Sequence, residues 1–193
     1  MAGITTIDSL LYRVALVLRQ YHATEVALID TRNNALATSD GYTANNFTSP
    51  TLASADVQVH RDTRTGITAR CVVAEVGDVT YSREFHYDNE GAASTMPRVD
   101  RTFRLEIEWI VNSDGGVMAG DGAKLRCNRL ADACVVTLGK YPLLSVPASA
   151  LDPLPMGPLT LRNDGLAKEQ KTDDTSRWRR ALVYDAQLFE HRA

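Results

Sequence analysis

The chain of 193 residues is 44% hydrophobic and 23% charged, which is typical of a folded globular protein and excludes disorder as its default state. Its formal charge of -3 excludes the overall basic character that draws a whole protein onto nucleic acid or an anionic membrane. Three cysteines without a CxxC pair argue against a disulfide framework and a zinc site, so we expect reduced thiols in a cytoplasm.

The first expected element is a helix over residues 7–21, where apolar residues recur at helical spacing after the N-cap candidates Thr5 and Thr6. Arg13 and Arg19 interrupt the apolar run, which is therefore too short and too charged to span a bilayer. We expect a short strand at 25–29. Asparagine, serine, glycine and proline then predict a long surface loop over residues 30–55.

Three strand patterns follow, at 57–59, 68–76 and 80–87. The break at Gly77 and Asp78 predicts a tight turn, so the second and third of these strands are expected to form a hairpin. Residues 88–97 are expected to be a second polar loop.

The clearest strand pattern spans residues 100–111, where one face carries Phe103, Leu105, Ile107, Trp109 and Val111. A glycine-rich loop at 112–122 leads into a helix over 121–138, for which Gly139 is the expected left-handed cap and Pro142 prevents a restart.

A proline-rich, extended connector is expected at 143–158, followed by a short strand near Leu159 and Leu161 and a polar loop at 164–176. The last strand, 177–191, would span about 45 Å at ~3.3 Å per residue, long enough to project beyond a small core. We therefore predict one α+β domain over 1–193, with a mixed or antiparallel sheet packed by two main helices and an expansion of loops and hairpin at about 31–98.

No constellation of residues points to catalysis. The four histidines (His22, His60, His86 and His191) lack metal-ligand spacing, and Cys71, Cys127 and Cys134 lie on apolar stretches where burial makes thiols inert. Loop 112–116 has too few carboxylates for calcium, and the glycines form no nucleotide-binding motif. Glu106 and Glu108 are best explained by cross-strand pairing with arginine. We therefore expect neither enzymatic activity nor a bound cofactor or metal.

A basic group surrounds Trp178 in the last strand and consists of Arg177, Arg179 and Arg180. Arginine pairs with phosphates and tryptophan stacks on bases, so a nucleic-acid-binding module is one interpretation. The preceding Asp173 and Asp174 would repel phosphate. Arginine and tryptophan are also the residue types enriched at the hot spots of protein interfaces. A protein interface is therefore favoured.

The order of elements resembles the tail terminator, or tail completion, proteins of tailed bacteriophages. The resemblance is strongest in RTFRLEIEWIV at 101–111 with the helix that follows, and it returns in SRWRRALVYDAQLF at 176–189. It covers about half of the chain and is a pattern of elements rather than a signature motif. Region 31–98 is an expansion relative to compact members of the family.

The resemblance implies a virion protein without catalytic activity, assembled in the host cytoplasm. Its subunits would form a hexameric ring that caps the head-proximal end of the tail tube and joins it to the neck. The implied partners are further copies of the chain, the tail tube protein, a neck or stopper protein and, in a contractile tail, the sheath protein. DNA would only pass through the lumen. A heterologous interface closes into such a ring when its rotation closes.

Three groups of residues are candidates for the interface. Asn45, Asn46 and Phe47 lie in the first long loop, where an exposed aromatic side chain would be unusual without a partner. Gly115, Gly116 and Met118 lie in the strand-to-helix loop, and Trp178, Arg179 and Arg180 begin the terminal strand. The alternatives are a head-closure (stopper) or other tail-tube-associated protein, a small hydrolase, and the nucleic-acid-binding module.

Overall fold

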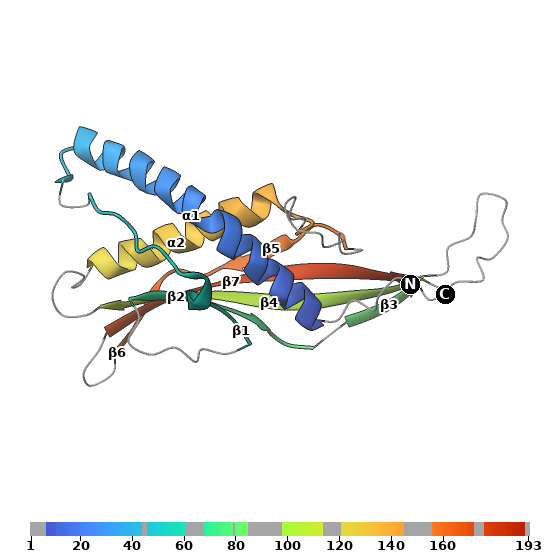
Figure 1. Ribbon diagram of the computed structural model, residues 1–193. Helices are drawn as coiled ribbons and strands as arrows, with labels where there is room; N and C mark the ends of the chain where they lie inside the picture. Colours follow the sequence, from blue (N-terminus) through green and yellow to red (C-terminus); the bar gives the residue numbers. More distant parts are fainter. Residues whose placement is uncertain are drawn as a thin grey trace.

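The computed structural model describes residues 7–43, 46–60, 68–78, 80–84, 98–113, 121–144, 156–171 and 176–191. Within these residues, two α-helices lie on one face of a seven-stranded sheet with both antiparallel and parallel pairs (Figure 1). The expected α+β class is therefore confirmed. Helix α1 covers β1 and β2, and α2 covers β4 and β7, so the apolar core lies between the helices and the sheet.

Helix α1 spans Ile7–Ser39, much further than the 7–21 expected from sequence. The strand expected at 25–29 and the first ten residues of the loop expected at 30–55 are wrong, because both lie in this helix. Burial continues past residue 21 as far as Asp30, but two of the buried residues there, Glu25 and Asp30, are charged. They pair with Lys140 and Arg129 of α2. Apolar periodicity therefore disappears from the sequence although helical burial continues.

Helix α2 spans Asp121–Lys140 and buries the expected stripe, formed by Cys127, Leu130, Ala131, Cys134 and Leu138. The expected left-handed cap at Gly139 is wrong, because that residue is still helical. The positive φ values found for glycine are at Gly41, which follows α1, and at Gly77, which follows β2. The chain leaves α2 instead through a turn at Pro142 and reaches Leu144, whose φ is +53°.

The sheet is built on two long central strands, β4 (Arg98–Ser113) and β7 (Ser176–His191). They pair in antiparallel register from Arg98 and His191 to Ser113 and Ser176. On one side of this pair lie β2 (Ala69–Glu75) and then the parallel β1 (Val57–Val59), which follows the short 3-10 helix Ser54–Asp56. The alternation expected for 100–111 is confirmed, since its five apolar residues are all at most 5% exposed.

Strand β3 (Thr80–Glu84) does not form the expected hairpin with β2. Both strands pair with β4 on the same side, β2 with Leu105–Val111 and β3 with Arg98–Thr102. Gly77, at φ +76°, lies in the short break between them, where a left-handed residue redirects the chain without folding it back. The end of the expected strand, 85–87, and loop 88–97 lie outside the described residues.

The other edge of the sheet consists of β5 (Thr160–Asp164) and β6 (Lys168–Lys171), which pair in succession along β7. Strand β6 was missed in the sequence, where 164–176 reads as a polar loop. All four of its residues are exposed, so no alternation of apolar and polar residues marks it. Most of the connector expected at 143–158 lies outside the described residues, but Met156 already bridges to Leu188 of β7.

Candidate interaction surfaces

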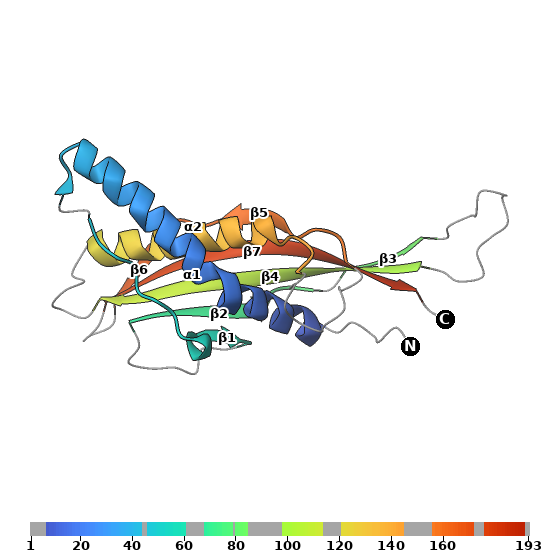
Figure 2. The same ribbon diagram turned by 45° about the horizontal axis from the view of Figure 1, so that its top comes forward.

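The long central strands continue past the helical layer. In Figures 1 and 2, the ends of β3, β4 and β7 reach beyond both helices as a narrow ribbon. We call residues 80–84, 98–102 and 187–191 the β-arm. Here β3 pairs with β4, and β4 pairs with β7. The terminal strand was expected to project from the core, and it does so as part of this three-stranded element.

The outer strands of the described sheet are β1 and β3 on one side and β5 and β6 on the other, and the β3 edge differs from the β5–β6 edge. Within the described part of the chain, β3 pairs only with β4, so its outer edge presents unpaired backbone groups. The β5–β6 edge has a register shift between Leu161 and Asn163 and carries exposed charges from Arg162, Lys168 and Lys171. Bulges and edge charges oppose the addition of another strand. The β3 edge of the β-arm is therefore better suited than the β5–β6 edge to receive a strand from a neighbour.

The candidates at 45–47 are held against the helices. Asn45 lies outside the described residues, and the exposed Asn46 donates a hydrogen bond from Nδ2 to Thr38 Oγ1 (2.7 Å). Phe47 is half-buried rather than exposed, because the guanidinium groups of Arg126 and Arg129 lie 4.5 and 4.0 Å from its ring centroid. The expectation of an exposed aromatic side chain is therefore wrong for Phe47.

A buried ion pair fixes this segment. Arg129 Nη1 and Asp30 Oδ1 are 2.9 Å apart, and both side chains are 8% exposed. Asp30 also accepts hydrogen bonds from the backbone amide (2.6 Å) and hydroxyl (2.8 Å) of Ser49. Asn34 exchanges two further bonds with the backbone of Phe47. These bonds hold α1, α2 and segment 46–49 together. Each of the two buried charges has several hydrogen-bond partners, which a buried charge needs to offset the loss of its hydration.

The candidates Gly115, Gly116 and Met118 lie outside the described residues. Trp178 is half-buried and packs against the core, with the ammonium group of Lys124 lying 5.5 Å from its ring centroid. The aromatic ring thus faces α2 inside this chain. Trp178 and Phe47 therefore both contact α2, Trp178 through Lys124 and Phe47 through Arg126 and Arg129.

The two arginines after Trp178 point to opposite faces of β7. Arg179 pairs with Glu108 across to β4, on the face without helices, which agrees with the expected pairing of that glutamate with arginine. Arg180 is 7% exposed and lies between the carboxylates of Asp132 and Asp164, each at 2.8 Å. This guanidinium joins α2, β7 and the β5–β6 turn, so it is already engaged within the subunit.

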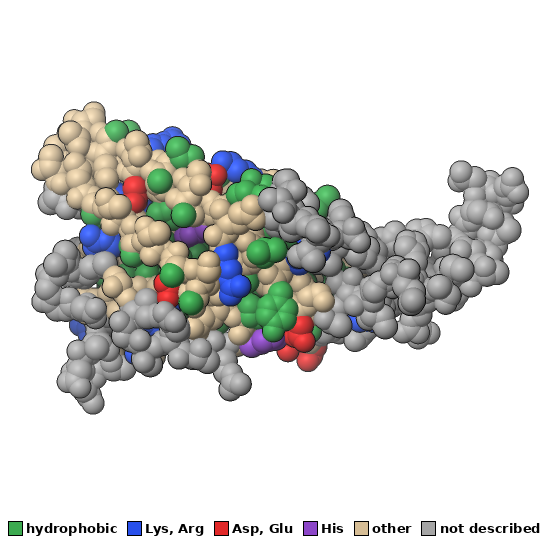
Figure 3. Space-filling model, in the orientation of Figure 1, with side chains coloured by type: hydrophobic (Ala, Val, Ile, Leu, Met, Phe, Trp, Pro, Cys, Tyr) green, Lys and Arg blue, Asp and Glu red, His purple; other side chains and the backbone are tan. Residues whose placement is uncertain are grey.

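The remaining charges on the outer face of the sheet are also mixed. Asp185 lies between Arg104 (3.5 Å) and Arg162 (2.5 Å), which come from the neighbouring strands β4 and β5. On the one face that Figure 3 shows, the basic and acidic side chains of the described residues are interspersed and form no continuous patch of one sign. This pattern does not favour the nucleic-acid alternative, which requires a concentrated basic surface.

The cysteines and the core histidine are packed as structural groups. All three thiols are buried, and burial raises the pKa of Cys127 and Cys134 to about 12 and that of Cys71 well above its usual value. His22 is 3% exposed, stacks on Trp109 with a centroid distance of 4.3 Å, and hydrogen-bonds the carbonyl oxygen of Leu130 (2.8 Å). Burial is the main reason that its pKa falls to about 4.

No protein-family model matches this chain, and no curated protein matches its sequence. Among the described residues, no group of three or more histidine, cysteine, aspartate or glutamate side chains is arranged to hold a metal ion. None of the described helices has a stretch that is both long and apolar enough to cross a membrane. The chain is therefore assigned to no family by these comparisons.

Proposed function

We propose that this protein is a structural subunit of a phage tail terminator ring, which caps the head-proximal end of the tail tube and joins it to the neck. The order of its elements resembles that family, as described for 101–111 and 176–189. The observation that carries the proposal is the β-arm, a ribbon that extends beyond the helices and ends in an open strand edge. An open edge binds a neighbouring chain through main-chain hydrogen bonds.

In the proposed ring, the β-arm of one subunit contacts a different surface of the next. Such a heterologous contact, repeated around an axis, closes into a ring. The β5–β6 edge, with its bulge and charges, is protected against the same kind of pairing. Because the β3 edge is open to pairing and the β5–β6 edge is protected, subunits would join one another in one direction only. A closed ring of head-to-tail contacts needs such one-way joining.

The outer surface of α1 supplies a second candidate contact. Leu28 and Leu36 are 57% and 54% exposed and lie about two turns apart. Between them in the sequence, the hydroxyl of Thr31 donates a hydrogen bond to the carbonyl oxygen of Ala27 (2.8 Å), so its proton is no longer available to water or to a partner. Exposed apolar side chains grouped on one element are typical of interaction sites.

The test combines mass measurement with imaging. Light scattering would follow the oligomeric state of the purified protein, and electron microscopy would follow its binding to isolated tail tubes. A terminator binds tube ends as a ring and stops growth, whereas a tube subunit forms long cylinders by itself. A protein that stays monomeric and ignores tube ends would refute the proposal, and turnover of a substrate by the purified chain alone would replace it with the hydrolase alternative.

The β-arm can be tested separately with two matched variants. Thr80→Lys places a charge on the open β3 edge, and Thr160→Lys places the same charge on the β5 edge. Both threonines are exposed, so neither change disturbs the core. We expect the first variant to lose ring formation or tube binding while the second keeps both. Equal behaviour of the two variants would show that the β3 edge is not the contact.

A further inference from the structure

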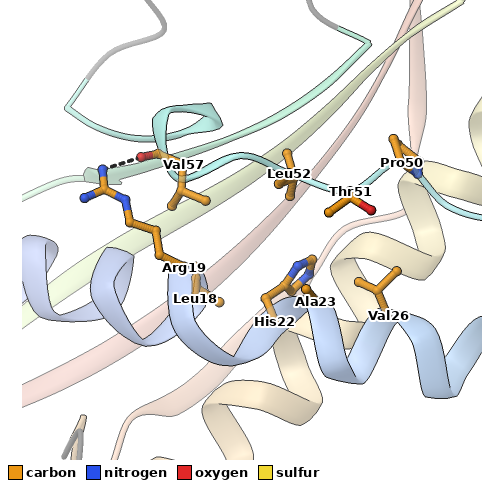
Figure 4. Close-up of a pocket in the computed structure, with 9 residues that line it drawn as sticks. All are labelled: Leu18, Arg19, His22, Ala23, Val26, Pro50, Thr51, Leu52 and Val57. Carbon is orange, nitrogen blue, oxygen red and sulfur yellow. Dashed lines mark hydrogen bonds between the residues drawn. The ribbon is translucent and has the colours of Figure 1, made fainter. Parts of the chain in front are cut away.

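The two sides of α1 differ in what covers them. Its inner side packs on the sheet, on α2 and on segment 50–57, which crosses α1 as Figure 4 shows. Arg19 Nη2 donates a hydrogen bond to the carbonyl oxygen of Val57 (2.7 Å), and the pocket between helix and segment leaves only about 40 Å³ of water-sized space. The inner side is therefore filled by the chain itself.

The outer side of the second half of α1 is exposed and almost uncharged. Among its exposed residues between 23 and 39, the only charged one is Arg32; the others are alanine, threonine, serine and the two leucines Leu28 and Leu36. Thr38, like Thr31, donates its hydroxyl to its own helix, at the carbonyl oxygen of Asn34 (2.8 Å). A helix side that faces solvent usually carries several charges, so this side has the composition of a contact surface.

A row of three exposed residues follows this side to the end of the helix. Arg32, Leu36 and Asp40 are spaced four residues apart, so they form one i±4 row with a rise of about 6 Å per step. Asp40 still follows the helical pattern, because its amide donates to the carbonyl oxygen of Leu36 (3.0 Å). In both Figures 1 and 2 this end of α1 diverges from α2, and the row is exposed along its whole length.

The two charges of this row are not paired within the described part of the chain. There, neither the guanidinium of Arg32 nor the carboxylate of Asp40 makes an ion pair or a side-chain hydrogen bond. Asp40 also follows the C-terminal end of α1, where the last carbonyl oxygens carry a negative partial charge, and the last turn holds no basic residue. A carboxylate at this place is unfavourable unless a cation from elsewhere compensates it.

We propose that α1 pairs with the same helix of a second copy of this chain, antiparallel to it, about a two-fold axis at Leu36. The symmetry places Arg32 of each copy beside the partner's Asp40 and packs the two Leu36 side chains together. Two i±4 rows pack against each other at about −50°, the commonest helix crossing. Both charges are then paired, and each guanidinium lies at a helix C-terminus that lacks a cation. This isologous contact differs from the head-to-tail contact of the ring and does not depend on it.

The contact is small, so the expected dimer is weak. Two helical segments of this length bury less than the roughly 1,200 Å² of a stable complex, which suggests a dissociation constant on the order of 0.1 mM. Sedimentation equilibrium at concentrations around this value measures it, and added salt should weaken the dimer because exposed ion pairs are screened. Thr80→Lys, which blocks the β3 edge, should keep the dimer; its loss there would mean that the copies associate through the β-arm instead.

Charge reversal tests the pairing itself. Arg32→Asp brings two carboxylates together at each end of the contact, and Asp40→Arg brings two guanidinium groups together there. Each variant alone should therefore associate about tenfold more weakly. A mixture of the two variants should associate as the unaltered protein does, because each copy supplies the charge that the other lacks. Lys168→Asp is the matched control: it reverses an exposed charge on β6, away from α1, and should leave the dimer unchanged.

Cross-linking tests the position of the two-fold axis. Leu36 meets its own copy on the axis, so Leu36→Cys should form a disulfide-linked dimer under a mild oxidant. Leu28→Cys is the control, because Leu28 is equally exposed but lies about two turns from the axis, and it should cross-link several-fold more slowly. The native thiols are buried and do not compete.

Three results would overturn the proposal. The first is equal cross-linking of the two cysteine variants. The second is a mixture of the charge-reversal variants that associates as weakly as each variant alone. The third is an unaltered protein that stays monomeric well above the expected dissociation constant.

Discussion

Acid should destabilise this protein through His22 at a pH where most of its carboxylates are still charged. The pKa of this histidine is about 4 in the folded chain instead of the usual 6.5, mainly because burial disfavours the imidazolium. Between these two values the unfolded chain binds a proton that the folded chain does not bind. The free energy of unfolding therefore falls as the pH drops from 6.5 to 4, and it is fully retained above 6.5.

The size of the effect follows from the gap between the two pKa values. At about 1.4 kcal/mol per pH unit, His22 alone should remove about 3 kcal/mol between pH 6.5 and pH 4. Folded domains of this kind are stable by only about 5–15 kcal/mol, so one histidine accounts for a large part of the acid sensitivity.

Urea unfolding at a series of pH values, followed by tryptophan fluorescence, measures this loss. Trp109 is buried against the His22 ring, so its emission reports the same part of the core. The comparison is with His22→Phe, which keeps an aromatic ring at this position but does not titrate. Carboxylates contribute equally to both proteins, and the difference between their profiles isolates the histidine.

The unaltered protein should lose about 3 kcal/mol more than the His22→Phe variant over this range. At neutral pH the variant itself should be less stable by about 1–3 kcal/mol, because the hydrogen bond to the Leu130 carbonyl is absent. Parallel pH profiles for the two proteins would refute the reasoning and show that His22 titrates equally in both states.

Three further outcomes can be measured on the same material. The three cysteines should react with a thiol reagent at pH 8 only as fast as the protein unfolds, because the thiolate is the reactive form and burial disfavours it; a thiol that reacts at the rate of free cysteine would contradict this. Asp30→Ala should lower the free energy of urea unfolding by about 3–5 kcal/mol, since Arg129 remains buried without its carboxylate, and a loss below 1 kcal/mol would mean that the pair is not desolvated. Leu182→Ala should cost about 2–5 kcal/mol by the same assay, whereas Leu161→Ala, at an edge position that is 37% exposed, should cost under about 0.5 kcal/mol; equal losses would contradict the assigned core.

The elements predicted correctly from sequence are those whose buried face is apolar. Strand β4 alternates between large apolar and charged residues, and α2 carries an apolar stripe, so both were expected close to their observed bounds. The second half of α1 was missed because its buried positions include Glu25 and Asp30. Their partners, Lys140 and Arg129, are about a hundred residues away in the chain, and no local pattern reveals such pairs.

The sheet topology was only partly predictable. Gly77 correctly marks the end of β2, but a glycine with positive φ is compatible with a hairpin and with a break between two collinear strands. The second arrangement forms because β4 is long enough to pair with β2 and with β3, one after the other along its length. Similarly, the buried position of His22 could not be found from sequence, because its hydrogen-bond partner is a carbonyl oxygen contributed by α2.

The order in which the chain leaves the ribosome conflicts with the order of strands in the sheet. Strand β7 is the last of the described elements to be synthesised, yet it lies in the middle, between β4 and the β5–β6 edge. Until it is inserted, β4 has a vacant side, and β5 and β6 have no strand to pair with. Closure of the sheet therefore depends on contacts between distant parts of the chain, a property that slows folding in other proteins. A nascent chain halted before residue 176 would leave the backbone edge of β4 without its partner β7, so folding should be completed only after synthesis of the terminal strand.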